Sequence, residues 1–374
     1  MITRQVEINN EIKKGRVLVI YGSRQVGKTT LINNFLATTK LKYKMVTGDD
    51  IQLAAELSEC TMTTTTNFVG NYELLVIDEA QKIENIGRAL KLMVDHFPDR
   101  YFIATGSSSF DLASKTAESL TGRKNVIELF TISQAELLRS SSKSELTQEL
   151  ESYLIYGSYP DVINQHLYQE KERVIKQIAN SYLLKDVLAF EGIKNSKVIL
   201  SILKMIALQV GSEVSTVEIA NSVKVDYRTV AKYLDLLEKS FVIFSLPGFS
   251  RNLRKEISKM SKYYFYDLGI RNALISNFSK LSSRNDVGQL WENFVMIERM
   301  KNNSYMTTSA NYYFWRTHDQ KEIDLIEERG GKLYGYEIKW TGQRTKSPKL
   351  WLETYENAEY KEIDRENYLD FVTR

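Results

Sequence analysis

Two short segments near the N-terminus have the residue types and spacing that phosphate chemistry needs. Gly22 to Thr29 reads GSRQVGKT, which fits the pattern GxxxxGK[ST]. In this pattern the glycines let the backbone curl so that its N–H groups point at phosphate oxygens. Lys28 is expected to reach the β- and γ-phosphates, and the Thr29 hydroxyl to bind Mg²⁺. We therefore predict ATP and Mg²⁺ as cofactors. The predicted nucleotide-binding residues are Gly22, Ser23, Arg24, Gln25, Val26, Gly27, Lys28, Thr29 and Thr30.

The second segment is an apolar run, LLVI, followed directly by Asp78 and Glu79. Asp78 is expected to hold Mg²⁺ through water, and Glu79 to act as the general base that polarises the attacking water. A third apolar run, 101–104, ends in Thr105 and Ser107. These two side chains are candidates for contacting the γ-phosphate or the lytic water, and the alternative is a simple turn at the end of a strand.

The elements that must position these residues are short strands and the helices between them. The run RVLVIY comes directly before the glycine-rich loop, and a helical pattern begins at Thr30. This order predicts a parallel sheet with helices on both faces and the nucleotide at the carboxyl ends of the strands. Arg123, in the segment LTGR, is a candidate arginine finger that acts in cis or across a subunit boundary. A plain surface arginine is the competing interpretation.

A second constellation lies near the C-terminus. Glu292 stands in a predicted helix, Asp324 in a predicted strand, and Glu337 and Lys339 form an E-x-K pair on the next strand. Residues i and i+2 of a strand share a face, and a hairpin turn at Gly330-Gly331 brings the two strands together. The carboxylates are expected to hold a metal ion and Lys339 to activate a water, as in restriction endonucleases and junction resolvases. Exposed charges on a hairpin are the alternative.

The sequence pattern in the middle of the chain predicts helices followed by a strand. A helix is expected over 196–209, a second after Ser215 in the capping box Ser-x-x-Glu, and a third over 227–239 with Asp226 as its N-cap. A strand over 241–246 and a Pro-Gly turn follow, which together give the order of a winged helix-turn-helix. Residues 198–262 carry 10 Lys/Arg against 6 Asp/Glu, a modest excess. The basic residues expected to contact DNA phosphates are Arg228, Lys232, Lys239, Arg251, Arg254, Lys255 and Lys259.

Composition limits the class of protein. Hydrophobic residues make up 43% and charged residues 26% of 374 residues, with a net charge of +3, which is ordinary for a folded globular chain. A single cysteine allows no internal disulfide, and the three histidines lie far apart. Without a signal-peptide pattern or a long apolar run, we expect a cytoplasmic protein that does not enter a membrane. We interpret the threonine-rich run 61–66 as a loop.

Together these segments resemble a known family. The segments GSRQVGKTTLI, LLVIDEAQKI, ATGSSSFDL, LTGR and GSYPDVI resemble AAA-like P-loop ATPases of the archaeal-type/STAND-related group. The segments YYFYDLGIRNAL, GQLWENFV and EIDLI…YEIKW resemble the C-terminal region of that family, a DUF4143-like region with a PD-(D/E)XK nuclease fold. The resemblance covers nearly the whole chain and implies an ATPase domain joined to this region.

The predicted fold is α/β, and the predicted function is ATP hydrolysis that controls a DNA-directed C-terminal region. An additional Mg²⁺-dependent nuclease activity stays open. One alternative is a regulatory nucleotide switch that binds protein partners through an inert nuclease-like fold. A second alternative is a loader-like ring of identical subunits, in which Arg123 would act in trans. The predicted domains are a P-loop ATPase domain at 1–150, a helical connector at 151–196, a winged helix at 197–280 and a nuclease-like domain at 281–374.

Overall fold

The chain forms two compact units in this computed structural model. The structure describes residues 2–106, 120–182, 195–250, 261–317, 321–342 and 349–374. The smaller unit holds residues 6–131 together with 239–241, and the larger unit holds 1–5, 132–238 and 242–374. Within the described residues, no helix is long and apolar enough to cross a membrane. Each unit has its own sheets and is described separately below.

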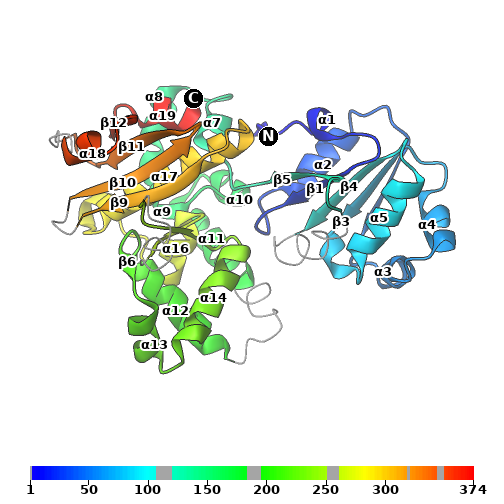
Figure 1. Cartoon of the computed structure of the whole chain (residues 1–374), viewed down its shortest axis with the longest axis horizontal. Helices are drawn as coiled ribbons and strands as arrows, with labels where there is room; N and C mark the ends of the chain where they lie inside the picture. The colour runs from blue at the N-terminus through cyan, green and yellow to red at the C-terminus, as the bar shows by residue number, and fades with distance from the viewer. Residues whose placement is uncertain (1, 107–119, 183–194, 251–260, 318–320, 343–348) are drawn as a thin grey trace. The chain divides into compact units, whose positions relative to one another are not determined.

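The smaller unit is built on a five-stranded parallel sheet in the order β2-β3-β4-β1-β5 (Figure 1). This confirms the predicted parallel α/β architecture, and the strand that contains Thr105 lies beside the strand that ends in Asp78. All five strands point the same way, so their carboxyl ends share one edge of the sheet. The strands are β1 (Val17–Tyr21), β2 (Tyr43–Thr47), β3 (Leu74–Asp78), β4 (Tyr101–Gly106) and β5 (Lys124–Glu128).

Helices cover both faces of this sheet (Figure 1). One face forms a continuous apolar core with α3, α4 and α5, in which Val17, Ile77 and Phe102 meet Phe68 and Leu90. Alternate residues of the same strands point to the opposite face, where α2 packs. The helices are α1 (Ile8–Glu11), α2 (Lys28–Leu36), α3 (Ile51–Ser58), α4 (Met62–Val69) and α5 (Ile86–His96), with a 3₁₀ turn η1 (Ala80–Lys82).

The threonine-rich run is helical, and the loop prediction was wrong. Thr61 is the N-cap of α4, and its hydroxyl accepts a hydrogen bond from the Thr64 N–H. Threonine is a weak helix former because its β-branched side chain loses rotamer freedom. Phe68 and Val69 at the end of α4 are nevertheless buried in the core. Burial of these two side chains therefore outweighs the local propensity.

The larger unit begins with short helices that follow Ile132. Its helices α9 and α11 pack on α16, which brings segments far apart in sequence together. Among them α10 and α11 lie within the predicted connector 151–196, and all of these helices share one compact unit with the C-terminal sheet. They are α7 (Gln134–Leu137), α8 (Lys143–Gln148), α9 (Leu150–Tyr156), α10 (Pro160–Ile163), α11 (Tyr168–Tyr182) and α16 (Leu268–Leu274).

Three helices and a small antiparallel sheet follow, and its strand β6 lies between the first two helices, where the sequence predicted no strand. Asp226 caps α14, as predicted, since its Oδ1 accepts from the Arg228 N–H over 2.8 Å. The sheet has the order β6-β8-β7. The predicted contacts of Arg251, Arg254, Lys255 and Lys259 lie outside the described residues. The elements are α12 (Ser196–Leu208), β6 (Glu213–Val214), α13 (Thr216–Val223), α14 (Tyr227–Lys239), β7 (Ile243–Leu246) and β8 (Ser261–Phe265).

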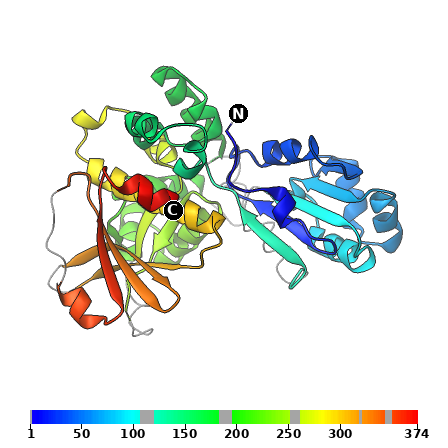
Figure 2. The same cartoon turned by 90° about the horizontal axis from the view of Figure 1, so that it is seen from above.

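The C-terminal part is a four-stranded sheet in the order β12-β11-β10-β9, with helices on both sides (Figure 2). The predicted hairpin is confirmed, because β10 and β11 are antiparallel and Gly330 and Gly331 both have positive φ. One face buries Trp351 of α18, and the other contacts α17 and, through Tyr336 against Phe371, α19. The elements are η3 (Leu281–Ser283), α17 (Val287–Tyr305), β9 (Asn311–Arg316), β10 (Glu322–Arg329), β11 (Lys332–Ile338), α18 (Lys349–Thr354), β12 (Ala358–Ile363) and α19 (Tyr368–Thr373).

The compact units differ from the domain boundaries that the sequence suggested. The smaller unit ends at Thr131 rather than at residue 150, and no unit boundary falls near 196 or 280. One reason is that Phe249, which follows β7, is buried in the core of the C-terminal sheet beside Trp351. The Phe249 N–H also donates to the Phe314 carbonyl of β9 over 2.6 Å. The segments predicted as winged helix and nuclease-like domain therefore share one core.

Candidate active site

The glycine-rich loop joins β1 to α2 at the carboxyl edge of the parallel sheet. Gly22 has no room for a side chain, because a Cβ there would lie 2.0 Å from the Leu129 carbonyl oxygen of the neighbouring chain segment. Gly27 has φ 97° at the N-cap of α2, a conformation that L-residues with side chains rarely adopt. Steric constraints therefore require glycine at both positions. The loop leads directly into a helix N-terminus, which favours anions.

Lys28 closes the loop in this structure. Its side chain is buried, and its ammonium donates to the Gly22 carbonyl over 2.9 Å and to the Ser23 carbonyl over 2.8 Å. Val26 is fully buried, so its side chain belongs to the core and only its backbone can face a phosphate. Gln25, Thr29 and Thr30 are exposed and Arg24 is half-buried. The structure therefore gathers the predicted loop residues around one cationic group.

Asp78, at the end of β3, is the centre of a hydrogen-bonded chain of polar groups. The Thr29 hydroxyl donates to Asp78 Oδ2 over 2.8 Å, and the Thr105 hydroxyl donates to Asp78 Oδ1. The Glu79 N–H in turn donates to the Thr105 hydroxyl oxygen over 3.0 Å. The two oxygens expected to hold Mg²⁺ are thus adjacent, which fits a hydroxyl-plus-carboxylate site for a hard cation.

Glu79 has the left-handed backbone conformation, with φ 51° and ψ 39°. A non-glycine residue in this region is strained by about 1 kcal/mol or more, and such strain clusters at functional sites. Its carboxylate accepts a 2.6 Å hydrogen bond from the Gln81 side-chain amide. Sequence reasoning missed Gln81, although it stands two residues after the predicted base. Its side-chain amide is the hydrogen-bond donor to the Glu79 carboxylate.

Two further residues, Ser107 and Arg123, were predicted to belong to this site. Ser107 lies outside the described residues. Arg123 precedes β5, and its carbonyl accepts from the Val17 N–H at the amino ends of the strands. Since β5 has five residues, Arg123 lies on the order of 16 Å from the carboxyl edge. Its guanidinium is paired with Asp95, Nε to Oδ1, over 2.6 Å. Arg123 therefore does not reach the loop within its own chain, and only action in trans stays a prediction.

The structure brings the four residues of the C-terminal constellation into one cluster. Lys339 Nζ lies 2.6 Å from Glu337 Oε1 and 3.7 Å from Asp324 Oδ2. Asp324 Oδ2 also accepts from the Ile338 N–H over 2.8 Å. Glu292, on α17, joins them closely enough that the charge of Asp324 affects its pKa. The expected proximity of helix and hairpin residues is therefore present.

Three residues that the sequence pattern did not reveal complete this cluster. Tyr264 on β8 donates to Glu292 Oε1 over 2.6 Å. Lys262, also on β8, contacts the Glu322 carboxylate and lies 3.8 Å from Glu292 Oε1. Glu322 precedes Asp324 by two positions, so the i, i+2 rule could have suggested it. Lys262 and Tyr264 lie before the constellation in the chain, and no local pattern connects them to it.

Burial dominates the electrostatics of this cluster. It raises the pKa of Glu292 to about 8, and the charge of Asp324 adds to the rise. Burial likewise raises the pKa of Asp324, and it raises the pKa of Glu337 to about 6. Burial alone would lower the pKa of Lys262, but the charges of nearby carboxylates, Glu292 and Glu322 foremost, raise it overall. The carboxylates here are thus reluctant to ionise, and the ammonium group stays charged.

The acidic cluster does not fit a divalent metal ion as it stands. A hard cation in a protein needs several ionised or carbonyl oxygens that converge within about 2.0–2.6 Å. Among the described residues, no three Asp, Glu, His or Cys side chains are gathered in a way that could hold a metal ion. The oxygens of Glu292 and Glu322 converge on the Lys262 ammonium instead. The metal-binding roles predicted for Glu292, Asp324 and Glu337 are therefore not supported by this geometry.

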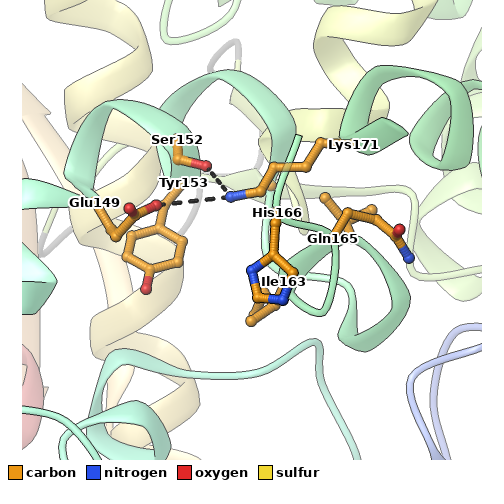
Figure 3. Close-up of a pocket in the computed structure, with 9 residues that line it drawn as sticks. Glu149, Ser152, Tyr153, Ile163, Gln165, His166 and Lys171 are labelled. Atoms are coloured by element: carbon orange, nitrogen blue, oxygen red, sulfur yellow. Dashed lines mark hydrogen bonds and ion pairs between the residues drawn. The ribbon is translucent and has the colours of Figure 1, made fainter. Parts of the chain in front are cut away.

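The larger unit also contains a small pocket among α9, α10 and α11 that the sequence did not suggest (Figure 3). Lys171 donates to the Ser152 hydroxyl over 2.7 Å and lies 3.6 Å from Glu149 Oε2. Tyr153 and His166 also line the space. Because Glu149 already neutralises the Lys171 ammonium, the pocket offers little excess positive charge to attract a phosphate.

Comparisons with known proteins agree with the N-terminal chemistry. Residues 14–138 match the family model of an AAA domain. Residues 147–281 and 287–368 match two models that are each described as a domain of unknown function, DUF8612 and DUF4143. The chain therefore carries an AAA-like ATPase domain in its N-terminal part and a DUF4143 match in its C-terminal part.

Relatives and solved structures were also found. An uncharacterized protein of Mycobacterium tuberculosis is 27% identical over 348 residues, which span 92% of this chain and 74% of the relative. An uncharacterized protein of Methanocaldococcus jannaschii is 26% identical over 347 residues, which span 87% of this chain and 75% of the relative. A Walker-type ATPase of Pyrococcus abyssi matches with a TM-score of 0.46 and 15% identity, over 69% of this chain and 91% of that chain.

Proposed function

We propose that the protein hydrolyses ATP to ADP and phosphate with Mg²⁺, and that its nucleotide state controls a DNA-directed larger unit. The observation that carries the ATPase part is the polar chain at Asp78, which joins Thr29, Thr105 and Glu79 at the mouth of the glycine-rich loop. These groups come from α2, β3 and β4, whose relevant ends meet at one edge of the parallel sheet. The AAA-domain match over residues 14–138 supports the same proposal.

Each residue has a separate chemical role in this proposal. Lys28 exchanges its two carbonyl acceptors for phosphate oxygens, so its charge neutralises the β- and γ-phosphates. Thr29 and Asp78 hold the Mg²⁺ that accompanies ATP and stabilises the charge on the phosphates. Glu79 accepts a proton from the attacking water while Gln81 holds its other carboxylate oxygen. Thr105 forms hydrogen bonds to both Asp78 and the Glu79 backbone N–H. It therefore holds the metal ligand and the general base in fixed positions relative to each other.

The test of the ATPase part is turnover by the Lys28→Ala variant compared with wild type. The variant lacks the positive charge that stabilises the transferred phosphoryl group, so we expect turnover to fall to background. The Lys28 ammonium donates to two carbonyls of the loop itself, so the circular dichroism spectrum and Tm should change little. Unchanged turnover in a folded Lys28→Ala protein would show that ATP is not hydrolysed at this site.

The DNA-directed part is supported by the helix pair α13 and α14 and the small sheet that follows. This order is that of a winged helix-turn-helix, in which the second helix enters the major groove. The buried side of α14 holds Val230, Leu234 and Leu237, and its exposed side presents Arg228 and Lys232 one turn apart. Side chains at i and i+4 share a helix face, so both can reach one phosphate backbone.

Binding to duplex DNA across a range of salt concentrations tests this part. For the Arg228→Ala/Lys232→Ala variant we expect weaker binding and a log K against log[salt] slope reduced by about 2. The matched control is Lys332→Ala/Lys361→Ala, which removes the same charge from exposed positions of the C-terminal sheet. Binding that both variants reduce equally, or that wild type lacks at low salt, would contradict the proposed role of α14.

A second candidate function is a nucleotide-dependent switch that binds protein partners. The observation that favours it is the ammonium of Lys262 inside the acidic cluster, which argues against cleavage by Glu292, Asp324, Glu337 and Lys339. Salt-dependent DNA binding separates the two candidates, since only the DNA-directed function requires it.

A further inference from the structure

The most unusual ionic group of the larger unit is the side chain of Lys262 on β8. Only 4% of it is exposed, although lysine side chains are rarely buried unless they are paired. Its ammonium contacts the Glu322 carboxylate of β10 and lies 3.8 Å from Glu292 Oε1 of α17. It also lies 5.2 Å from the centre of the Phe314 ring, a cation–π distance. A buried cation therefore stands where acidic side chains from two elements converge.

Every carboxylate around this ammonium has a partner of its own. Glu292 accepts from Tyr264, and Asp324 accepts from the Ile338 N–H and faces Lys339. Glu322 has Lys262 on one side and Arg316 on the other, with Arg316 Nε 3.7 Å from its Oε2. Glu337 lies 2.6 Å from Lys339 Nζ, and Arg316 is shared with Glu213 of β6 over 3.1 Å. Every carboxylate of the cluster thus has a hydrogen-bond or ion-pair partner within the protein.

A divalent ion could enter only by displacing this arrangement. The ammonium of Lys262, which already pairs with the Glu322 carboxylate, would repel the charge of the ion. Moving the ammonium to water would in turn strip the pairing from buried carboxylates, which is strongly unfavourable. Binding of a metal and retention of Lys262 in its present position are therefore alternatives.

We propose that the Lys262 ammonium is the resident cation of this acidic cluster, and that the protein binds no divalent metal ion there while Lys262 is in place. This inference goes beyond the proposed ATPase function and does not depend on it. It makes Lys262 a positioning residue that ties β8 to α17 and β10. The four-residue pattern of helix glutamate, strand aspartate and E-x-K is then retained in a site without a metal.

The experiment measures Mn²⁺ bound to the full-length chain by electron paramagnetic resonance, without nucleotide. All arms carry Asp78→Asn, so that the ATP site contributes little binding. We expect no bound Mn²⁺ in this parent and one bound ion per chain in the Lys262→Met variant, with affinity at least about tenfold above any in the parent. Addition of Asp324→Asn to Lys262→Met should abolish the new site. Lys332→Met, the same change at an exposed position of the hairpin, should gain nothing.

Two results would overturn the proposal. One is Mn²⁺ binding by the parent that Asp324→Asn removes, because a metal would then coexist with Lys262. The other is a folded Lys262→Met variant that gains no site. The parent arm needs no change at position 262, so it decides the question even if Lys262→Met does not fold. ATP turnover is not read in any arm, so these outcomes are separate from those of the Lys28→Ala test.

Discussion

The hydroxyl of Thr29 and the carboxylate of Asp78 meet over 2.8 Å, although 49 positions separate them in the chain. Thr29 opens α2 directly after the glycine-rich loop, and Asp78 ends β3. β3 is two strands away from β1 in the sheet, with β4 between them. The parallel order of the strands therefore creates the proposed Mg²⁺ site by placing both oxygens at the same edge.

The first prediction concerns this pair. Replacement of Thr29 by alanine removes the hydroxyl oxygen, so we expect the Mg²⁺ concentration for half-maximal ATP turnover to rise about tenfold or more. Thr29→Ser keeps the hydroxyl and should stay close to wild type. Turnover is measured against Mg²⁺ at saturating ATP. Equal Mg²⁺ dependence of the alanine and serine variants would show that this hydroxyl is not a ligand.

The second prediction concerns Thr105, which contacts both Asp78 and the Glu79 N–H. Thr105→Val keeps the shape but leaves two polar groups without their partner, at a cost of about 1–3 kcal/mol. We expect kcat to fall roughly 10- to 100-fold, since positioning of metal ligand and base is lost together. Thr105→Ser retains the hydroxyl and serves as the control. If valine and serine give the same kcat, Thr105 has no positioning role.

The third prediction concerns Arg123, which lies at the amino ends of the strands in an ion pair with Asp95. Because the loop lies at the opposite edge of the sheet, Arg123→Ala should change ATP turnover by less than about twofold at low protein concentration. Turnover is then compared over a range of protein concentrations. A loss that Arg123→Ala causes only at high concentration would indicate that a second copy supplies the arginine.

Much of the smaller unit could be predicted because its signals are local. The glycine-rich loop is contiguous, and the apolar runs before Gly22, Asp78 and Thr105 are each one buried strand. The helix α4 was missed since its local signal, a run of threonines, points the other way, and only the burial of Phe68 and Val69 explains it. Gln81 was missed because nothing in a sequence shows which amide will face a neighbouring carboxylate.

The acidic cluster combines residues whose proximity the sequence predicts with one residue that it does not predict. The proximity of Asp324, Glu337 and Lys339 follows from the hairpin geometry, and the structure agrees. The presence of Lys262 does not follow, because β8 reaches the cluster only through tertiary packing of the larger unit. A single buried ammonium, that of Lys262, occupies the place that the pattern assigns to a metal ion.

The fourth prediction concerns Gly157, whose φ is 77° and whose added Cβ would lie 2.0 Å from Asp267 Oδ1. Asp267 is buried and accepts hydrogen bonds from the Ser158 N–H and the Gly269 N–H, over 2.8 and 2.9 Å. Gly157→Ala should therefore lower the stability of the larger unit by on the order of 3 kcal/mol, seen as a lower Tm. Gly288→Ala is the control, because a Cβ there meets nothing within 4 Å. The segments GSYPDVI and YDLGIRNAL thus meet in a close packing contact.

The fifth prediction concerns the pH dependence of stability. Burial, followed by the charge of Asp324, raises the pKa of Glu292 to about 8, whereas an unfolded glutamate titrates near about 4.3. The folded state therefore binds this proton more tightly, so the stabilisation is complete below about pH 4.3 and is lost as the pH rises through about 8. The Tm of wild type should accordingly fall between about pH 5.5 and 8.5, and Glu292→Gln, which stays uncharged, should flatten this fall.

Glu359→Gln, at an exposed position of β12, should leave the profile of wild type unchanged. A profile that Glu292→Gln leaves equally steep would mean that Glu292 is ionised in the folded state, and it would then be available as a partner for the charge of Lys262.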